Sequence, residues 1–213
     1  MSASTRRVAR LQVAGSDGTS SGTAHARQCR DVEINGPPIP CTAPQGGAAF
    51  SPCRRYRYAL WRSWRDLTSS GKSYAMFIGL NPSTADETIN DATIRRCIAF
   101  AKGWGYDGLC MTNLFAFRAM DPAEMLAQAD PIGGENDSYL STLAAKAGVV
   151  VAAWGVLGGH LDRDQSVRTM LPALHCLSLT KDGHPAHPLY LPAQLKPIPW
   201  LPTKTPHSAL EHV

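Results

Sequence analysis

Continuous apolar runs separated by amphipathic stretches predict alternating strands and helices along this chain. Four runs are apolar enough for strands that a sheet buries on both faces. They span residues 73–80, 108–113, 149–153 and 175–179. Apolar residues recur at helical spacing over 91–102, 134–147 and 161–171, and Asp121-Pro122 has the residue types that open a short helix. Strands that alternate with helices form a parallel sheet, so we expect an α/β fold with a short, mostly parallel, four-stranded sheet.

Outside these blocks the pattern is weaker. Residues 1–50 are rich in small and polar residues without periodicity, which predicts a flexible or loosely ordered amino-terminal extension. Residues 51–213 then form a single α/β domain with a carboxyl-terminal tail. Residues 56–65 begin with alternating aromatic and basic positions, which suits an edge strand that passes into a helix with Leu60, Trp61 and Trp64 on its apolar face. Their arginines either cover aromatic rings with their stems or contact phosphate.

The first predicted strand ends in a dense polar turn. In a parallel sheet all carboxyl ends meet at one edge, where open α/β folds bind their ligands. Asp91 is also a candidate helix N-cap, while arginines in a first helical turn oppose the helix dipole and hint at a nearby anion. The candidate binding residues here are Gly79, Leu80, Asn81, Pro82, Ser83, Thr84, Asp86, Asn90, Asp91, Arg95 and Arg96.

Later segments bring further candidates to the same edge. Asn113 ends the second strand, and its amide can read a base edge or a sugar hydroxyl. Phe115 and Arg118 follow it, and Trp154 follows the third strand, where it stacks on a planar ligand or fills the core. The late loop carries His184-Pro185 and His187-Pro188, in which each proline restricts the preceding histidine to extended geometry. A histidine held in this way can stabilise a developing oxyanion.

Composition narrows the compartment and the partners. The net charge of +4 permits a polyanionic ligand, and we expect a nucleic acid or a nucleotide. None of the six cysteines forms a CxxC pair, and we expect neither a metal nor another cofactor. No run is apolar enough for a membrane span, and the first residues lack the apolar core of a secretory signal, so we expect a cytoplasmic protein.

Two motifs together resemble those of the uracil-DNA glycosylase superfamily. They are Gly79-Leu-Asn81-Pro82 and the late loop from His184 to Leu189. Over about residues 53–200 the chain is also similar to an uncharacterised bacterial and phage domain family, domain of unknown function 1643. That similarity is carried by residues 55–62, the block 79–97, Thr112-Asn-Leu-Phe115 and residues 180–192.

The glycosylase resemblance implies a three-layer αβα fold and hydrolysis of an N-glycosidic bond in DNA, RNA or a nucleotide. Carried over, Asn81 or Asp86 would position water and His184 would face the base, with Asn113 as a base reader. The late loop has Ala186-His187 where the superfamily has a serine and a proline. Two alternatives stay open: a binding module without catalysis, and a metal-dependent phosphoesterase that uses Asp86, Asp91 and His184.

Overall fold

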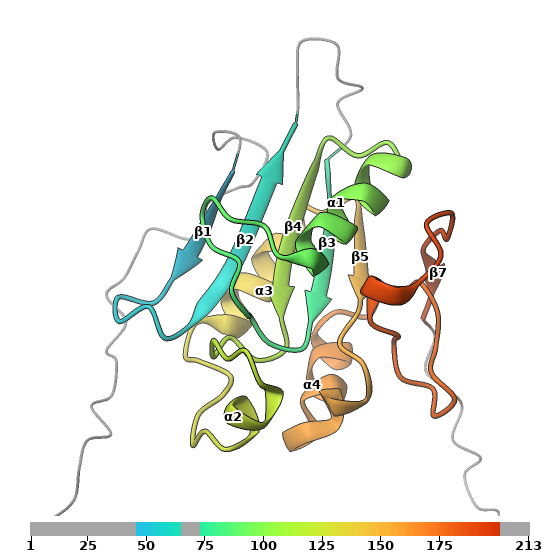
Figure 1. The fold of residues 1–213 in the computed structure, drawn as a ribbon. Helices are drawn as coiled ribbons and strands as arrows, with labels where there is room; N and C mark the ends of the chain where they lie inside the picture. Colours follow the sequence, from blue (N-terminus) through green and yellow to red (C-terminus); the bar gives the residue numbers. More distant parts are fainter. Residues whose placement is uncertain (1–45, 65–72, 201–213) are drawn as a thin grey trace, which may run out of the picture.

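A single mixed sheet forms the centre of the protein (Figure 1). The computed structural model describes residues 46–64 and 73–200. The sheet order is β1-β2-β4-β3-β5-β6-β7. The strands are β1 (Gly46–Phe50), β2 (Arg57–Ser63), β3 (Tyr74–Gly79), β4 (Gly108–Asn113), β5 (Val149–Ala152), β6 (His175–Cys176) and β7 (Ile198–Pro199).

The four predicted strands are the parallel centre of this sheet. β4, β3, β5 and β6 lie side by side in that order, and each adjacent pair is parallel. The prediction of four strands was incomplete, because β1, β2 and β7 add antiparallel strands at the two edges. β1 also lies inside the segment predicted to be an extension, so order begins by Gly46. Residues 1–45 and 201–213 lie outside the described part of the chain.

The predicted edge position and the predicted helix around Trp61 are both wrong, because residues 57–63 form strand β2, which lies inside the sheet. This strand pairs with β1 on one side and β4 on the other. It is covered on both faces, so Leu60 is fully buried and Trp61 is 8% exposed. A strand buried on both faces carries apolar residues at consecutive positions, and over so short a run that pattern cannot be told from a buried helical turn.

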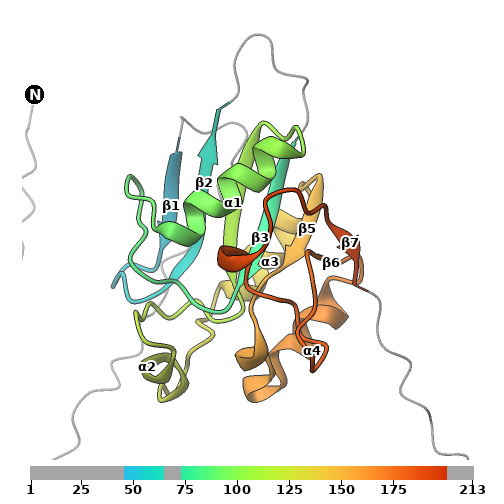
Figure 2. The ribbon, with the colours of Figure 1, turned by 45° about the vertical axis from the view of Figure 1, so that its right-hand side comes forward.

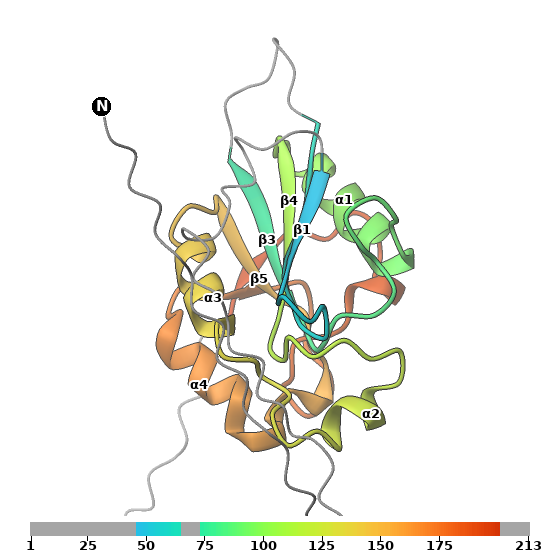
Figure 3. The same ribbon diagram turned by 90° about the vertical axis from the view of Figure 1, so that its left-hand side faces the viewer.

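Helices cover both faces of the sheet, which gives three layers (Figures 2 and 3). The α-helices are α1 (Ala92–Gly103), α2 (Pro122–Leu126), α3 (Asn136–Ala144) and α4 (Arg163–Met170), and the 3₁₀ helices are η1 (Val156–Asp162) and η2 (Pro188–Tyr190). α1 buries Ile94, Cys97 and Phe100 against one face of the sheet, in a core that includes Phe77. α3 and α4 contribute to a second core, which contains Met76 and Ile78.

Cap residues explain where the helices begin. The Asp91 side chain accepts a hydrogen bond from the Ile94 backbone N–H at 2.8 Å, which makes Asp91 the N-cap of α1 as the sequence indicated. Asp121 caps α2 in the same way. The predicted helix over 161–171 starts two residues later, because Leu161 and Asp162 adopt positive φ angles and separate η1 from α4.

The late loop is tied to the carboxyl ends of the parallel strands. The Gly155 N–H, which follows β5, donates to the Pro185 carbonyl at 2.9 Å. The Ala186 N–H donates to Ser178, and Arg96 of α1 donates to the Leu191 carbonyl. The last of these bonds joins residues 95 positions apart in the sequence. Within the described residues, no helix combines the length and apolar character that a membrane crossing requires.

Candidate functional site

A cavity of about 220 Å³ opens at the carboxyl ends of β3 and β4, and we call it the inner cavity. It receives residues from the early polar turn, from the end of β4, from the segment after β5 and from the late loop. Eight of the predicted site residues line it: Gly79, Leu80, Asn81, Ser83, Asp91, Asn113, Trp154 and His187. The two motifs on which the resemblance rests therefore share one cavity, through Asn81 and His187.

Asn81 is held by its amide nitrogen. Its Nδ2 donates to the Ala119 carbonyl at 2.9 Å and to the Pro82 carbonyl at 3.2 Å. These bonds fix the side chain against the loop that follows β4. Among the described residues, its Oδ1 accepts no hydrogen bond. Asn81 therefore presents an oriented acceptor to whatever enters the inner cavity.

Asn113 and Arg57 form the polar floor of the inner cavity. Asn113 is 1% exposed, and its Oδ1 accepts a long hydrogen bond of 3.4 Å from Arg57 Nη2. Within the described residues its Nδ2 donates to no acceptor. Gly79 leaves room for this amide, because a Cβ there would lie 2.8 Å from Nδ2. The side chain of Asn113 thus supplies an oriented donor beside the Asn81 acceptor.

Arg57 is a functional candidate that was not among the predicted site residues, although the sequence allowed the arginines of residues 56–65 a phosphate contact. It is 2% exposed, and its Nη1 donates to the Ala85 carbonyl at 2.7 Å. Its Nε has no hydrogen-bond partner, and it forms no ion pair with any residue that the structure describes. Burial lowers the pKa of this guanidinium to about 10. The sequence pattern that could have indicated Arg57 is its position between Tyr56 and Tyr58. Side chains alternate between the faces of a strand, so Arg57 lies on the face opposite to these two stacked rings.

Asp91 and His187 face the inner cavity from α1 and from the late loop. One oxygen of Asp91 caps α1, and the other accepts no hydrogen bond from the described residues. The His187 Nδ1 accepts from the Leu189 N–H at 3.4 Å, which places the hydrogen of the neutral imidazole on Nε2. Partial burial lowers the pKa of His187, although the nearby Asp91 carboxylate opposes this effect. His187 is therefore neutral at pH 7 and can donate through Nε2.

Trp154 lines the inner cavity but belongs mainly to the core. It is 2% exposed, and its ring packs edge-on against Trp200 with centroids 5.4 Å apart. Its Nε1 is buried without a hydrogen-bond partner. Gly158 allows this packing, since a Cβ there would lie 2.2 Å from the Trp154 ring.

Asp86 and Asn90 hold the early loop together and do not line the inner cavity. The Asp86 Oδ1 accepts from the backbone N–H groups of Ile89 and Thr88 at 2.7 and 2.8 Å, and these two bonds lower the pKa of its carboxyl group. Asn90 accepts from Arg62 Nε at 2.8 Å. Arg62 also donates to the Asp86 carbonyl, so its buried guanidinium organises this loop from β2.

The remaining predicted residues lie elsewhere. Phe115 is fully buried in the core, so it cannot stack on a ligand. The His184 backbone N–H donates to Thr180 Oγ1, and the side chain lies outside the inner cavity. Arg95 donates to the Asn90 carbonyl from an exposed position, and Pro82 accepts from the Ala119 N–H. Arg96 lies over the Phe100 ring and ties α1 to the late loop.

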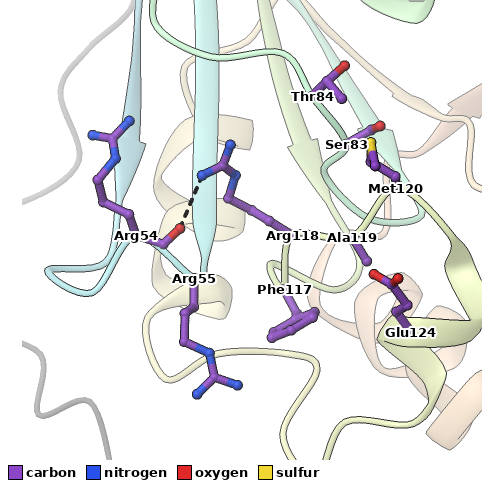
Figure 4. Close-up of a pocket in the computed structure, with 9 residues that line it drawn as sticks. All are labelled: Arg54, Arg55, Ser83, Thr84, Phe117, Arg118, Ala119, Met120 and Glu124. Carbon is purple, nitrogen blue, oxygen red and sulfur yellow. Dashed lines mark hydrogen bonds between the residues drawn. The ribbon is translucent and has the colours of Figure 1, made fainter.

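Thr84 and Arg118 line a second hollow, of about 370 Å³, which we call the outer groove (Figure 4). It adjoins the inner cavity, because Ser83, Ala119 and Met120 line both. Its other lining residues are Arg54, Arg55, Phe117 and Glu124. Within the described ranges, no three His, Cys, Asp or Glu side chains gather as a metal site would require.

Comparison with known proteins identifies the family of the chain. No curated protein and no solved structure matched it. The model of one family, described as "Protein of unknown function (DUF1643)", matches residues 57–189. This match covers more than half of the sequence and contains β2, the early polar turn, Asn113 and the two histidines of the late loop. The chain therefore belongs to the DUF1643 family of proteins of unknown function.

Proposed function

We propose that the protein is a glycosylase-like hydrolase that cleaves the N-glycosidic bond of a nucleobase in a nucleic acid or a nucleotide. One observation carries this proposal: Asn81 of the early turn and His187 of the late loop line the same cavity, together with Asp91 and Asn113. The proposal differs in two residues from the expectation drawn from the resemblance. Asp91 replaces Asp86 and His187 replaces His184, because Asp91 and His187 line the inner cavity and the other two residues do not.

The inner cavity suits a small planar ligand with polar edges. Its volume of about 220 Å³ is below the roughly 300–1,000 Å³ of sites for drug-sized molecules. The Asn81 Oδ1 offers an acceptor and the Asn113 Nδ2 a donor, which is the pairing that the edge of a nucleobase requires. Met111 and Ile94 provide apolar lining between them. A nucleobase satisfies both the shape and the polar groups.

The charges of the inner cavity match those of glycosidic cleavage. Water adds to C1′ of the sugar while the C1′–N bond breaks, and the bonding electron pair leaves on the base. The transition state therefore has oxocarbenium character on the sugar. The free oxygen of Asp91 can orient the water, accept its proton and stabilise the positive sugar. The His187 Nε2–H, with the positive field of Arg57, can stabilise the negative charge that develops on the base.

Release of free base by the purified full chain tests this proposal. Single-stranded DNA, duplex DNA, RNA and nucleotides that carry uracil or modified bases are incubated with the protein, and free base is measured by chromatography. We expect Asp91→Asn to abolish release while α1 stays capped, because asparagine is as good an N-cap as aspartate. His187→Asn should slow release by about 10²-fold or more, as for loss of a general acid or base group.

Two matched variants serve as controls. Asp86→Asn and His184→Asn make the same chemical changes outside the inner cavity, and we expect both to retain base release. Absence of release from every substrate, by protein that is folded and binds nucleotides, would leave the binding module as the function. The metal-dependent phosphoesterase gains no support from the geometry, since Asp86 and His184 lie outside the cavity that contains Asp91.

A further inference from the structure

The outer groove contains two arginines, Arg55 and Arg118, that form no ion pair with a described residue, although the Glu124 carboxylate also lines the groove. Arg54 forms an ion pair with Glu87, with N–O distances of 2.8 and 3.1 Å. Arg55 and Arg118 form no ion pair with any residue in the described ranges. Arg55 contacts the neutral side chain of Gln128 at 3.4 Å, and Arg118 donates to the Arg54 carbonyl at 3.2 Å. Both cations are therefore available to an anionic ligand.

Each of the two arginines packs against a different aromatic ring. The Arg118 guanidinium lies over the Phe50 ring, 4.9 Å from its centroid, and that of Arg55 lies 5.5 Å from the centroid of Phe117. In Figure 4 Arg118 points toward the backbone of Arg54, whereas Arg55 points the opposite way, beside Phe117. The two guanidinium groups thus point in different directions, so they are placed to contact different phosphates rather than one phosphate group.

The outer groove adjoins the inner cavity, because Ser83, Ala119 and Met120 line both. Met120 lines both and is 77% exposed, an unusual position for a large apolar side chain. Because Met120 lies where the two hollows meet, it can contact the sugar or the base of a ligand that occupies both. Phe117 lines the other part of the groove, where its ring already packs against Arg55 and Tyr56. A groove that contains cations, beside a cavity that can hold a base, provides the basic parts of a site for single-stranded nucleic acid.

We propose that the outer groove binds the phosphodiester backbone of a single-stranded nucleic acid, one base of which enters the inner cavity. Arg55 and Arg118 contact different phosphates, and the hydroxyl groups of Ser83 and Thr84 lie along the path of the strand (Figure 4). This inference rests on the proposed function only in that the inner cavity accepts a base. A single strand is favoured because its bases need no extrusion from a duplex.

The salt dependence of strand binding tests this inference. A labelled short single strand is titrated with the full chain, and its fluorescence anisotropy is followed at several salt concentrations. Each phosphate contact contributes about 0.7 to the slope of log K against log salt for single strands. We expect Arg55→Gln and Arg118→Gln each to reduce the magnitude of the slope by about 0.7, and the double variant by about 1.4.

Two further variants separate a phosphate contact from a structural role. Arg118→Lys keeps the charge and should keep the slope, even though its contact with Phe50 changes. Arg95→Gln removes one exposed positive charge that lines neither hollow, so the slope should stay unchanged. Thermal melting by circular dichroism confirms that each variant is folded.

Several outcomes would overturn the inference. Slopes that are equal in wild type, Arg55→Gln and Arg118→Gln would place the phosphates elsewhere. A mononucleotide that binds as tightly as the strand would show that the outer groove contributes nothing to affinity. Tighter binding of a duplex than of a single strand would show that a single strand is not the preferred ligand. Strand binding with the expected slopes but without base release would support the outer groove as the strand-binding site and would contradict the proposed hydrolysis. Base release with unchanged slopes would support the hydrolysis and would contradict strand binding in the outer groove.

Discussion

Replacement of Arg57 by methionine tests whether the inner cavity is built around an uncompensated charge. Arg57 is 2% exposed, and no carboxylate in the described residues pairs with it. Methionine is similar in length and apolar, so it fills the same space without a charge. The variant therefore removes the cation and leaves the packing of β2 nearly intact. We expect it to abolish ligand binding at little cost to the fold.

The magnitude follows from two opposing effects. Burial lowers the pKa of Arg57 from its ordinary value to about 10, and at about 1.36 kcal/mol per pH unit the charged form costs roughly 3 kcal/mol in the folded state. The variant relieves this cost. It also leaves the buried Ala85 carbonyl without its donor, which costs about 1–3 kcal/mol. The free energy of unfolding should therefore change by less than about 2 kcal/mol at pH 7.

The free energy of unfolding should depend on pH differently in wild type and in Arg57→Met. The folded-state pKa of Arg57 lies below its unfolded value, so above about pH 10 the unfolded chain binds more protons than the folded chain. Arg57 therefore makes the wild type gain stability as the pH rises above about 10. Arg57→Met lacks that contribution, so its free energy of unfolding should fall relative to wild type as the pH rises above about 10.

Urea denaturation of both proteins, followed by tryptophan fluorescence, measures the stability, and anisotropy with a single strand measures the binding. A loss of about 3–5 kcal/mol would resemble the removal of one partner from a buried ion pair. That result would mean that the folded protein already compensates the charge and that Arg57 is purely structural. Unchanged affinity at unchanged stability would equally refute a role for Arg57 in ligand binding.

Two other predictions concern the inner cavity. In Gly79→Ala the new Cβ would lie 2.8 Å from Asn113 Nδ2 and 2.9 Å from Met111 Cε, so denaturation should show a loss of about 1–3 kcal/mol, and titration should show weaker ligand binding. Unaltered affinity would place the ligand away from Asn113. Partial burial lowers the pKa of His187, so base release should persist below pH 6.5. It should decline as the imidazole becomes protonated, because a protonated Nδ1 can no longer accept from the Leu189 N–H that orients the ring. A pH–rate profile should keep this decline in His184→Asn and lose it in His187→Asn.

Local patterns predicted the parallel part of the sheet and the caps of two helices. The predicted strand 108–113 coincides with β4, and Asp91 and Asp121 cap α1 and α2. These features depend on interactions within a few residues, so local sequence patterns are sufficient to predict them. The position of the polar turn at a carboxyl end followed from the same reasoning, because parallel strands end at one edge.

Only the tertiary structure decided which of several equivalent residues face the cavity. The sequence offers Asp86 beside Asp91 and His184 beside His187, and nothing periodic distinguishes the members of each pair. The direction of a loop side chain depends on backbone bonds such as those that Asp86 accepts, and on contacts such as that between Gly155 and Pro185. The role of Arg57 likewise depends on the strands that enclose β2. Its burial, without an ion pair to any described residue, is a property of the assembled fold and not of any local segment.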